Sequence, residues 1–233
     1  MIDSYYKLTD QNCKTRAGQD NETLWGEGVT HTATGNIGFC SDGLIHWYVS
    51  PELALLLNPI HAKISNPIVW EVMVSGRTVR EGDIKGGSQI MTTLRQIKAA
   101  EPTTTQRVAF AILCAKFVYH NDSFCSWADA WLAGDDRAET AASMAARTAW
   151  AAAMADVSED GDAADAAARA AAAASAAARA DDADAAVRAA EAAWVATWVA
   201  DAAARVGRAI DLPGLALKAI ASEWNGKGAI SHD

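Results

Sequence analysis

A chain of 233 residues with a formal net charge of -9 is long enough for one large or two small domains, and it is acidic. This acidity argues against broad, sequence-independent binding to DNA or RNA, because such binding needs Lys and Arg to neutralise phosphates. Hydrophobic residues make up 51% of the chain, but alanine inflates this figure and buries little apolar area.

The first hundred residues combine short β-forming runs with turns, which predicts a small mixed α/β domain over residues 1–101. A polar stretch, Thr9–Asn21, is expected to be a loop. Four segments are strand-like: Tyr5–Leu8, Thr23–Trp25, Val29–Thr32 and Leu44–Val49.

A short helix is expected at Glu52–Leu57, with Ser50 as its N-cap and an end before Pro59. The strand that follows should cover Ile68–Val74 and end at Gly76. A two-residue period places its large apolar residues on one face. These residues are Ile68, Trp70, Val72 and Val74. The pattern of Gln89–Lys98 is compatible with both a strand and a short helix.

Residues 102–224 are predicted to form a helical domain that is Ala-rich from residue 137. Pro102–Thr105 supplies a cap region, and Arg107–His120 has the apolar period of a helix. We expect the broad apolar face of this helix to pack on both parts of the chain. A second helix is expected at Ser123–Leu132.

Breaks near Val157–Gly161 and Asp181-Asp182 divide the Ala-rich tract into three expected helices. They cover about 137–156, 162–180 and 183–210, and a short helix at about 213–224 precedes a loose tail, 225–233. The breaks favour an antiparallel bundle over one long coiled coil. The predicted fold class is therefore α+β, with a mixed α/β domain followed by an Ala-rich antiparallel helical bundle.

Large side chains four residues apart are expected to fill the core of this bundle. The pairs are Trp127 with Trp131, Trp150 with Met154, Trp194 with Trp198, and Val195 with Val199. Acidic residues four positions before basic ones predict a solvated face. These pairs are Asp165 with Arg169, Asp184 with Arg188, and Asp201 with Arg205. An exposed subset of aromatic residues would mark a partner surface, and the Ala-rich helices are candidates for forming a homo-oligomer.

The cysteines are sparse and show neither a CxxC pair nor a Cys/His metal spacing, so no metal is expected. Their even number permits two disulfides, but the intervals resemble no secreted framework and favour reduced thiols. They are Cys13, Cys40, Cys114 and Cys125. The start of the chain lacks the pattern of a signal peptide, and the charges in the Ala-rich tract are too costly in lipid. We therefore expect a protein of the cytoplasm with no membrane partner.

A cluster of His46, Trp47 and Tyr48 precedes the capped helix and predicts a ligand site. His46 would act as an acid, a base or a hydrogen-bond donor, and Trp47 would stack on the ligand. The alternative is a half-buried strand whose alternate residues pack. His61 is similarly either a ligand or a turn histidine that bonds the backbone. The candidate ligand-binding set is Tyr6, His46, Trp47, His61 and Lys85.

No catalytic residue, cofactor or metal is assigned, because no triad, zinc spacing or phosphate-loop motif is present. Glycines around Lys85 lack the spacing of a phosphate loop and predict a turn. An ADP-ribosyltransferase-like fold is an alternative, since such NAD-using enzymes combine an early His or Arg, aromatic residues and a Glu. The residues that fit those roles are Tyr6, His31 or His46, and Glu71 or Glu81.

The order of segments resembles an uncharacterised family of proteins encoded by tailed phages and prophages. The resemblance is carried by Leu44–Tyr48, Ser50–Ala62, Asn66–Glu71, Gln106–Ala115, Trp127–Leu132 and the Ala-rich run. It spans nearly the whole chain and implies an accessory phage protein. Such proteins often interfere with host processes, including defence, but the resemblance supplies no activity and no catalytic residues.

The function expected from these observations is that of a non-enzymatic interaction protein acting in the host cytoplasm. It would bind a host immune protein or sequester a small nucleotide signal with His46, Trp47 and Lys85. The alternatives are the NAD-using transferase and a structural phage component.

Overall fold

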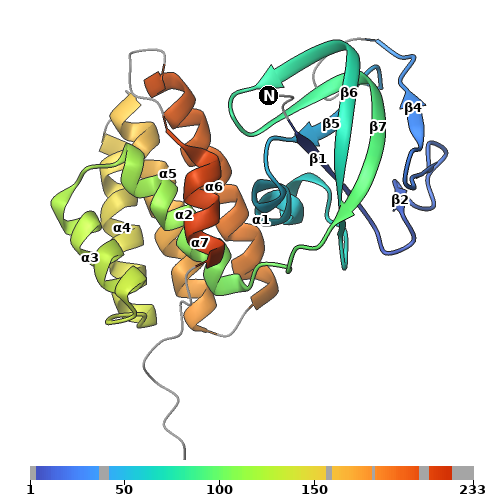
Figure 1. Ribbon diagram of the computed structural model, residues 1–233. Coiled ribbons are helices and arrows are strands. Elements are labelled where there is room, and N and C mark those ends of the chain that lie inside the picture. Colours follow the sequence, from blue (N-terminus) through green and yellow to red (C-terminus); the bar gives the residue numbers. More distant parts are fainter. Residues whose placement is uncertain (1–3, 37–41, 156–158, 180–181, 205–209, 222–233) are drawn as a thin grey trace, which may run out of the picture. The chain divides into compact units, whose positions relative to one another are not determined.

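The structure is a computed structural model that describes residues 4–36, 42–155, 159–179, 182–204 and 210–221. Two compact units divide the chain, Met1–Glu101 and Pro102–Asp233. The first is built around a β-sheet, and the second is helical (Figure 1). The predicted α+β class, with an N-terminal sheet and C-terminal helices, is therefore confirmed.

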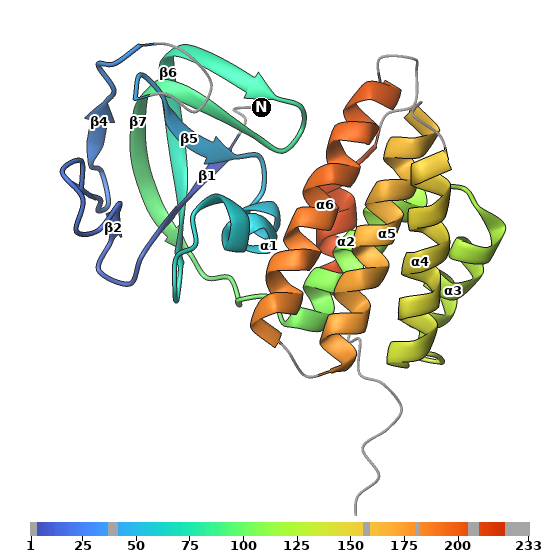
Figure 2. The ribbon, with the colours of Figure 1, turned by 180° about the vertical axis from the view of Figure 1, so that it is seen from behind.

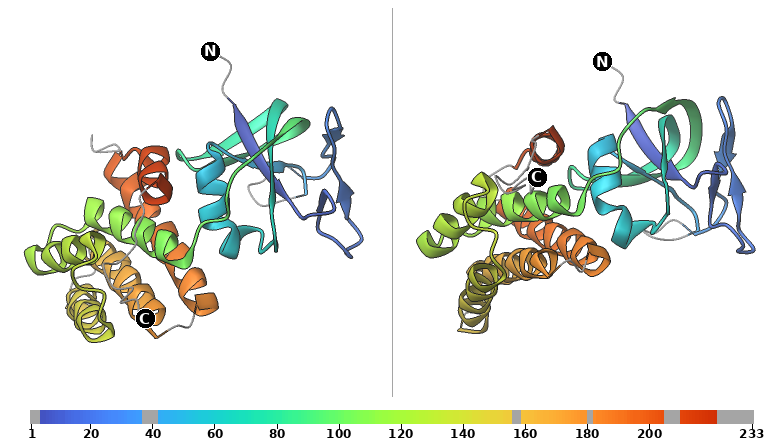
Figure 3. Two further views of the ribbon diagram at one scale, coloured as in Figure 1. Left: turned by 60° about the horizontal axis from the view of Figure 1, so that its bottom comes forward. Right: turned by 90° about the horizontal axis from the view of Figure 1, so that it is seen from below.

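Four antiparallel strands of the first unit close into a ring. β7 pairs with β5, β5 with β1, β1 with β6, and β6 again with β7, while β4 extends the sheet beside β7 (Figure 3). The strands are β1 (Tyr5–Thr9), β4 (Thr30–Thr32), β5 (Ile45–Tyr48), β6 (Ile68–Glu81) and β7 (Lys85–Ile97). A separate two-stranded sheet pairs β2 (Lys14–Thr15) with β3 (Thr23–Leu24), so part of the expected loop at Thr9–Asn21 is a strand.

A single long hairpin formed by β6 and β7 replaces two of the shorter segments that the sequence predicted. The expected end of the strand at Gly76 is wrong, because β6 continues through an irregularity between Ser75 and Thr78. Gly76 has a φ of 73°, a conformation that glycine adopts without steric cost. The ladder can therefore absorb extra residues in β6 and resume. Gln89–Lys98, which was compatible with either a strand or a helix, lies mostly in β7.

The one helix in the described part of this unit, α1 (Pro51–His61), begins as predicted and ends later than expected. The Ser50 hydroxyl accepts a hydrogen bond from the Leu53 backbone N–H at 3.2 Å. The expected end before Pro59 is wrong, because Pro59 lies in the last turn and removes only its own N–H donor. The N–H of Ala62 bonds the Asn58 carbonyl and completes the turn.

Large apolar side chains fill the inner face of the ring. The buried cluster contains Trp25, Trp47, Trp70, Val72 and Met91, and Ile68 and Val74 pack against it. The predicted shared face of Ile68, Trp70, Val72 and Val74 is therefore confirmed. Gly86 lies opposite Trp47, and a Cβ atom at Gly86 would collide with the Trp47 indole. Glycine at this position thus allows the indole to lie against β7.

Six helices form the described part of the second unit. They are α2 (Thr104–Val118), α3 (Asp122–Ala133), α4 (Glu139–Ala155), α5 (Glu159–Ala178), α6 (Asp182–Ala204) and α7 (Leu212–Ala221). The Thr103 hydroxyl accepts from the Gln106 N–H while the Gln106 side chain bonds the Thr103 N–H, which caps α2. Within this unit α2 packs against α5, α6 and α7. Its expected packing on the N-terminal part stays a prediction.

The helices α4, α5 and α6 lie side by side and run alternately up and down (Figure 2). Alanines make up most of their contact because small side chains let helices approach closely. A short polar network joins α4 to α5: Ser143 bonds Ser175 at 2.9 Å, and Arg179 bonds Ser175 and Glu139 at 3.1 and 2.9 Å.

The predicted large core pairs have different outcomes. Trp131 is buried and Trp127 is half-buried against Phe124, but the prediction that Trp150 and Met154 fill the core is wrong. Both are exposed, because α4 turns Ala142, Ala149 and Ala153 inward instead. The ion pairs Asp165–Arg169 and Asp184–Arg188 are confirmed. The side chains of Trp198, Val199, Asp201 and Arg205 and the tail 225–233 lie outside the described residues.

Candidate functional site

Several of the residues expected to bind a ligand share the outer face of the closed sheet. Tyr6 lies opposite Tyr48 on β5 and opposite Glu71 on β6, and Tyr48 lies opposite Lys85 on β7. Directly opposed residues of antiparallel strands point to the same face. Lys85, Tyr48, Tyr6 and Glu71 therefore form a continuous row across four strands.

The helix α1 adds His61, its last residue, to this row. The His61 Nδ1 atom lies 3.1 Å from the Tyr48 hydroxyl, and the two rings stack with their centroids 5.9 Å apart. His46 precedes Tyr48 by two residues on β5 and so shares its face. We call Tyr6, His46, Tyr48, His61 and Lys85 the outer polar cluster. Four of the five expected ligand-binding residues belong to it.

Trp47 is the exception, because it points to the inner face. It is fully buried, its Nε1 donates to the Ser88 hydroxyl at 2.8 Å, and its ring lies 4.0 Å from the ring of Tyr5. The Arg80 guanidinium lies over the same two rings. Trp47 is therefore a core residue, and this position does not fit the expected stacking on a ligand.

The surroundings of the two histidines are positive. Burial and, to a smaller extent, the charges of Lys7, Lys85 and Arg16 together lower the pKa of His46 to about 4. Burial also lowers the pKa of His61 to about 3, with smaller contributions from Lys85 and His46. Lys7, Lys85 and Arg16, which act on His46, are all cations. Both imidazoles are therefore neutral near pH 7 in a positive environment.

The opposite end of the row is acidic. Burial raises the pKa of Tyr6, and the carboxylates of Glu71 and Glu52 raise it further. Glu71 accepts hydrogen bonds from the Ser4 hydroxyl at 2.8 Å and from Arg95 Nε at 2.7 Å, which hold its pKa below the usual range. The outer polar cluster thus has a basic end at Lys85 and His46 and an acidic end beside Tyr6.

Lys7 belongs to this environment, although sequence reasoning missed it. It lies opposite Trp70 on the inner face, and its Nζ atom is 4.8 Å above the Trp25 ring and 3.4 Å from the His46 carbonyl oxygen. Burial and, to a smaller extent, the charge of Arg16 together lower its pKa to about 8. The two-residue period of β1 already places Lys7 on the same face as Tyr5, which was the available signal.

Of the residues considered for NAD chemistry, the structure brings Tyr6, His46 and Glu71 to one face. His31 is on β4 opposite Met91, where its ring packs edge-on against Trp25 and bonds the Leu24 carbonyl oxygen at 2.8 Å. It therefore belongs to the inner side of the sheet. The Glu81 side chain lies outside the described residues.

Neutral histidines and protonated tyrosines suit hydrogen bonding better than proton transfer near pH 7, because an effective acid or base has a pKa near the working pH. The described residues include no group of three His, Cys, Asp or Glu side chains suited to a metal ion. Within the described ranges, no helix combines the length and apolar character needed to cross a membrane.

Comparison of the chain with protein-family models, curated proteins and solved structures gives no match.

Proposed function

We propose that this protein is a non-enzymatic binding protein that sequesters a small anionic ligand of the nucleotide class at the outer polar cluster. The observation that carries the proposal is the position of Lys85 beside Tyr48 and His46 on one face of the sheet, where the charges of Lys7, Lys85 and Arg16 also lower the pKa of His46. Such an environment favours an anion and disfavours a cation. A ligand phosphate would meet the charge of Lys85 and the neutral imidazole of His46 at this end.

The acidic end of the cluster supports a nucleotide over inorganic phosphate. A nucleotide carries hydroxyl and amino donors on its ribose and base in addition to its phosphates. The Tyr6 hydroxyl offers an acceptor for such donors. Tyr48 lies between Tyr6 and Lys85 in the row, so one sheet holds both ends. One bound molecule would thus satisfy both ends of the row.

Binding is better supported than catalysis. The pKa values of His46 and His61 are lowered and that of Tyr48 is raised, so all three are moved away from neutrality. In the alternative NAD-using transferase, Glu71 would act on the ribose, but its carboxylate is already engaged by Ser4 and Arg95. That alternative is therefore the second candidate.

The resemblance to proteins of tailed phages supports a biological setting for this binding. In that setting the protein is a phage or prophage accessory protein in the host cytoplasm, and it removes a nucleotide signal that host defence uses. Binding to a host immune protein is compatible with the same setting, as is a structural role in the phage.

A panel of mononucleotides, cyclic dinucleotides and NAD tests the proposal on the full chain by thermal shift and native mass spectrometry. We expect one class to raise the melting temperature and to remain bound. Lys85→Glu should weaken binding by about tenfold or more, because it replaces an attractive charge with a repulsive one. Lys63→Glu is the matched control, because Lys63 is an exposed lysine just after α1.

Two results would overturn the proposal: no retained nucleotide in the panel, or equal binding by the wild type and Lys85→Glu. Turnover of NAD that stops in Glu71→Gln would instead support the transferase.

A further inference from the structure

One face of α4 exposes large apolar side chains in a helix whose inward contacts are made by alanine. Met144, Trp150 and Met154 are 62%, 50% and 64% exposed. Ala142, Ala149 and Ala153 are buried on the opposite side. Single exposed apolar residues need no explanation, but neighbouring ones on one helix face mark candidate contact surfaces.

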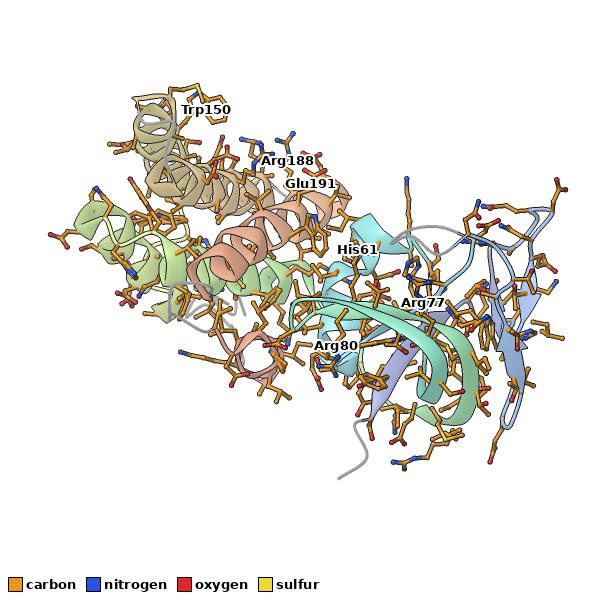
Figure 4. The ribbon with its side chains drawn as sticks, turned by 90° about the horizontal axis from the view of Figure 1, so that it is seen from above. His61, Arg77, Arg80, Trp150, Arg188 and Glu191 are labelled. Atoms are coloured by element: carbon orange, nitrogen blue, oxygen red, sulfur yellow. The ribbon has the colours of Figure 1, made fainter. Side chains whose placement is uncertain are left out.

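The spacing of these residues makes them neighbours. Met144 and Arg147 are three positions apart, Arg147 and Trp150 are three apart, and Trp150 and Met154 are four apart, so they follow one side of the helix. We call these four residues the α4 stripe. Figure 4 shows Trp150 pointing away from the bundle. The stripe therefore has two methionines at its ends and an indole beside one arginine.

We infer that the α4 stripe binds an amphipathic helical segment of another protein, one whose apolar residues flank a single carboxylate. Trp, Met and Arg are enriched in the centres of protein interfaces, while the charged residue at such a centre needs a partner. Methionine adapts its shape to different apolar partners, which suits the ends of the stripe. The inference concerns a different unit of the chain from the proposed nucleotide site and does not depend on it.

Arg147 decides the chemistry of the partner. It is exposed and forms no ion pair or hydrogen bond with another described residue. A partner that covers Met144 and Trp150 must also take the Arg147 guanidinium out of water, which is costly unless a carboxylate meets it. An apolar segment with Asp or Glu at the facing position therefore complements the stripe.

The same arginine argues against a second copy of this chain as the occupant. In an antiparallel pair of α4 helices with the symmetry axis at Arg147, the two Arg147 side chains would lie against each other. An axis at the middle of the stripe, near Ala149, would still leave the two arginines about one helical turn apart on the same face. Moving the symmetry axis toward Ser143 brings Arg147 to Glu139 of the other copy, but it leaves Trp150 and Met154 beyond the contact. The homo-oligomer expected from the Ala-rich helices stays a prediction that this face does not favour.

A displayed library of amphipathic helical peptides tests the inference, with fixed apolar positions around one randomised central position and the full chain as bait. We expect selected peptides to carry Asp or Glu at the centre. Arg147→Glu should reverse the preference to Lys or Arg, and Trp150→Ala should weaken selected peptides by about tenfold or more. Leu217→Ala is the control, because Leu217 is a similarly exposed apolar residue on α7.

The inference is overturned if the library gives no binder, if the central position shows no charge preference, or if binding survives Trp150→Ala. Sedimentation of the chain alone tests whether a second copy of the chain occupies the stripe. A wild-type dimer that dissociates in Trp150→Ala would assign the stripe to self-association. The nucleotide class that the wild type retains should raise the melting temperature of Arg147→Glu and Trp150→Ala by the same amount as in the wild type.

Discussion

In the N-terminal unit Trp25, Trp47 and Trp70 are 4%, 0% and 3% exposed, whereas Trp150 in the helical unit is half exposed. The difference follows from the kind of neighbour that each indole meets. A closed ring of strands encloses a volume that only large side chains fill. Helices with alanine faces approach so closely that no space remains for an indole between them. Trp150 on the alanine-faced helix α4 is therefore a surface residue, whereas Trp131 on α3, which is not one of these helices, is buried.

The two units are also stabilised in different ways. The sheet depends on a few large aromatic residues whose polar atoms are hydrogen-bonded, such as Trp70 Nε1 to the Thr9 hydroxyl at 3.1 Å. The bundle depends on many small alanine contacts, each of which contributes little area. Truncation of a large side chain should therefore be costly in the sheet and mild on the outer side of α4.

The largest expected effect comes from truncating one tryptophan in each unit. Trp47→Ala should lower the free energy of unfolding by about 3–5 kcal/mol, because it leaves a cavity and removes the Ser88 partner. Trp150→Ala should change it by about 0.5 kcal/mol or less, as for other surface positions. Urea denaturation followed by circular dichroism measures both. Equal losses in the two variants would contradict the assignment of core and surface.

A smaller effect should appear in the pH dependence of stability through Lys7. Its pKa is about 8 in the folded protein and 10.5 as the ordinary value, so the unfolded state binds more protons between these pH values. The free energy of unfolding should therefore rise with pH across this window, by on the order of 3 kcal/mol, and the contribution should be constant below it.

Lys7→Met should abolish that rise and stabilise the protein at pH 7, because it removes a charge from the aromatic interior. Denaturation series at several pH values measure the free energy of unfolding of both proteins. Subtracting one profile from the other cancels the contribution of the tyrosines, which titrate in both. A wild-type profile parallel to that of Lys7→Met would show that Lys7 keeps an ordinary pKa.

Local signals in the sequence were sufficient for most elements. The Ser50 cap, the cap region Pro102–Thr105 and the apolar period of β6 predicted α1, α2 and one face of the sheet. The closure of the ring could not be predicted in this way, because it depends on which distant strands pair. Trp150 was misassigned for a related reason: spacing along a helix identifies a face but not the neighbour that the face meets.

The candidate site also could be predicted only in part from local sequence. Composition around His46 and His61 suggested a ligand site, but only the strand register brings Tyr6, Tyr48 and Lys85 into one row. The alternation along β5 already separated His46 from Trp47, and Trp47 was nevertheless included because of its aromatic character. Lys7 was overlooked since a lysine in a strand is usually assigned to the solvent side.

The most direct test of the account is the charge state of His46 and His61, measured by nitrogen NMR of the imidazole rings at about pH 5.5, where ordinary histidines are largely protonated. We predict that both rings are neutral in the free protein. Binding of the retained nucleotide should raise the pKa of His46, because an anion favours the imidazolium form. A protonated His46 in the free protein would contradict the proposed anion site. So would a His46 signal that does not change when the nucleotide is added.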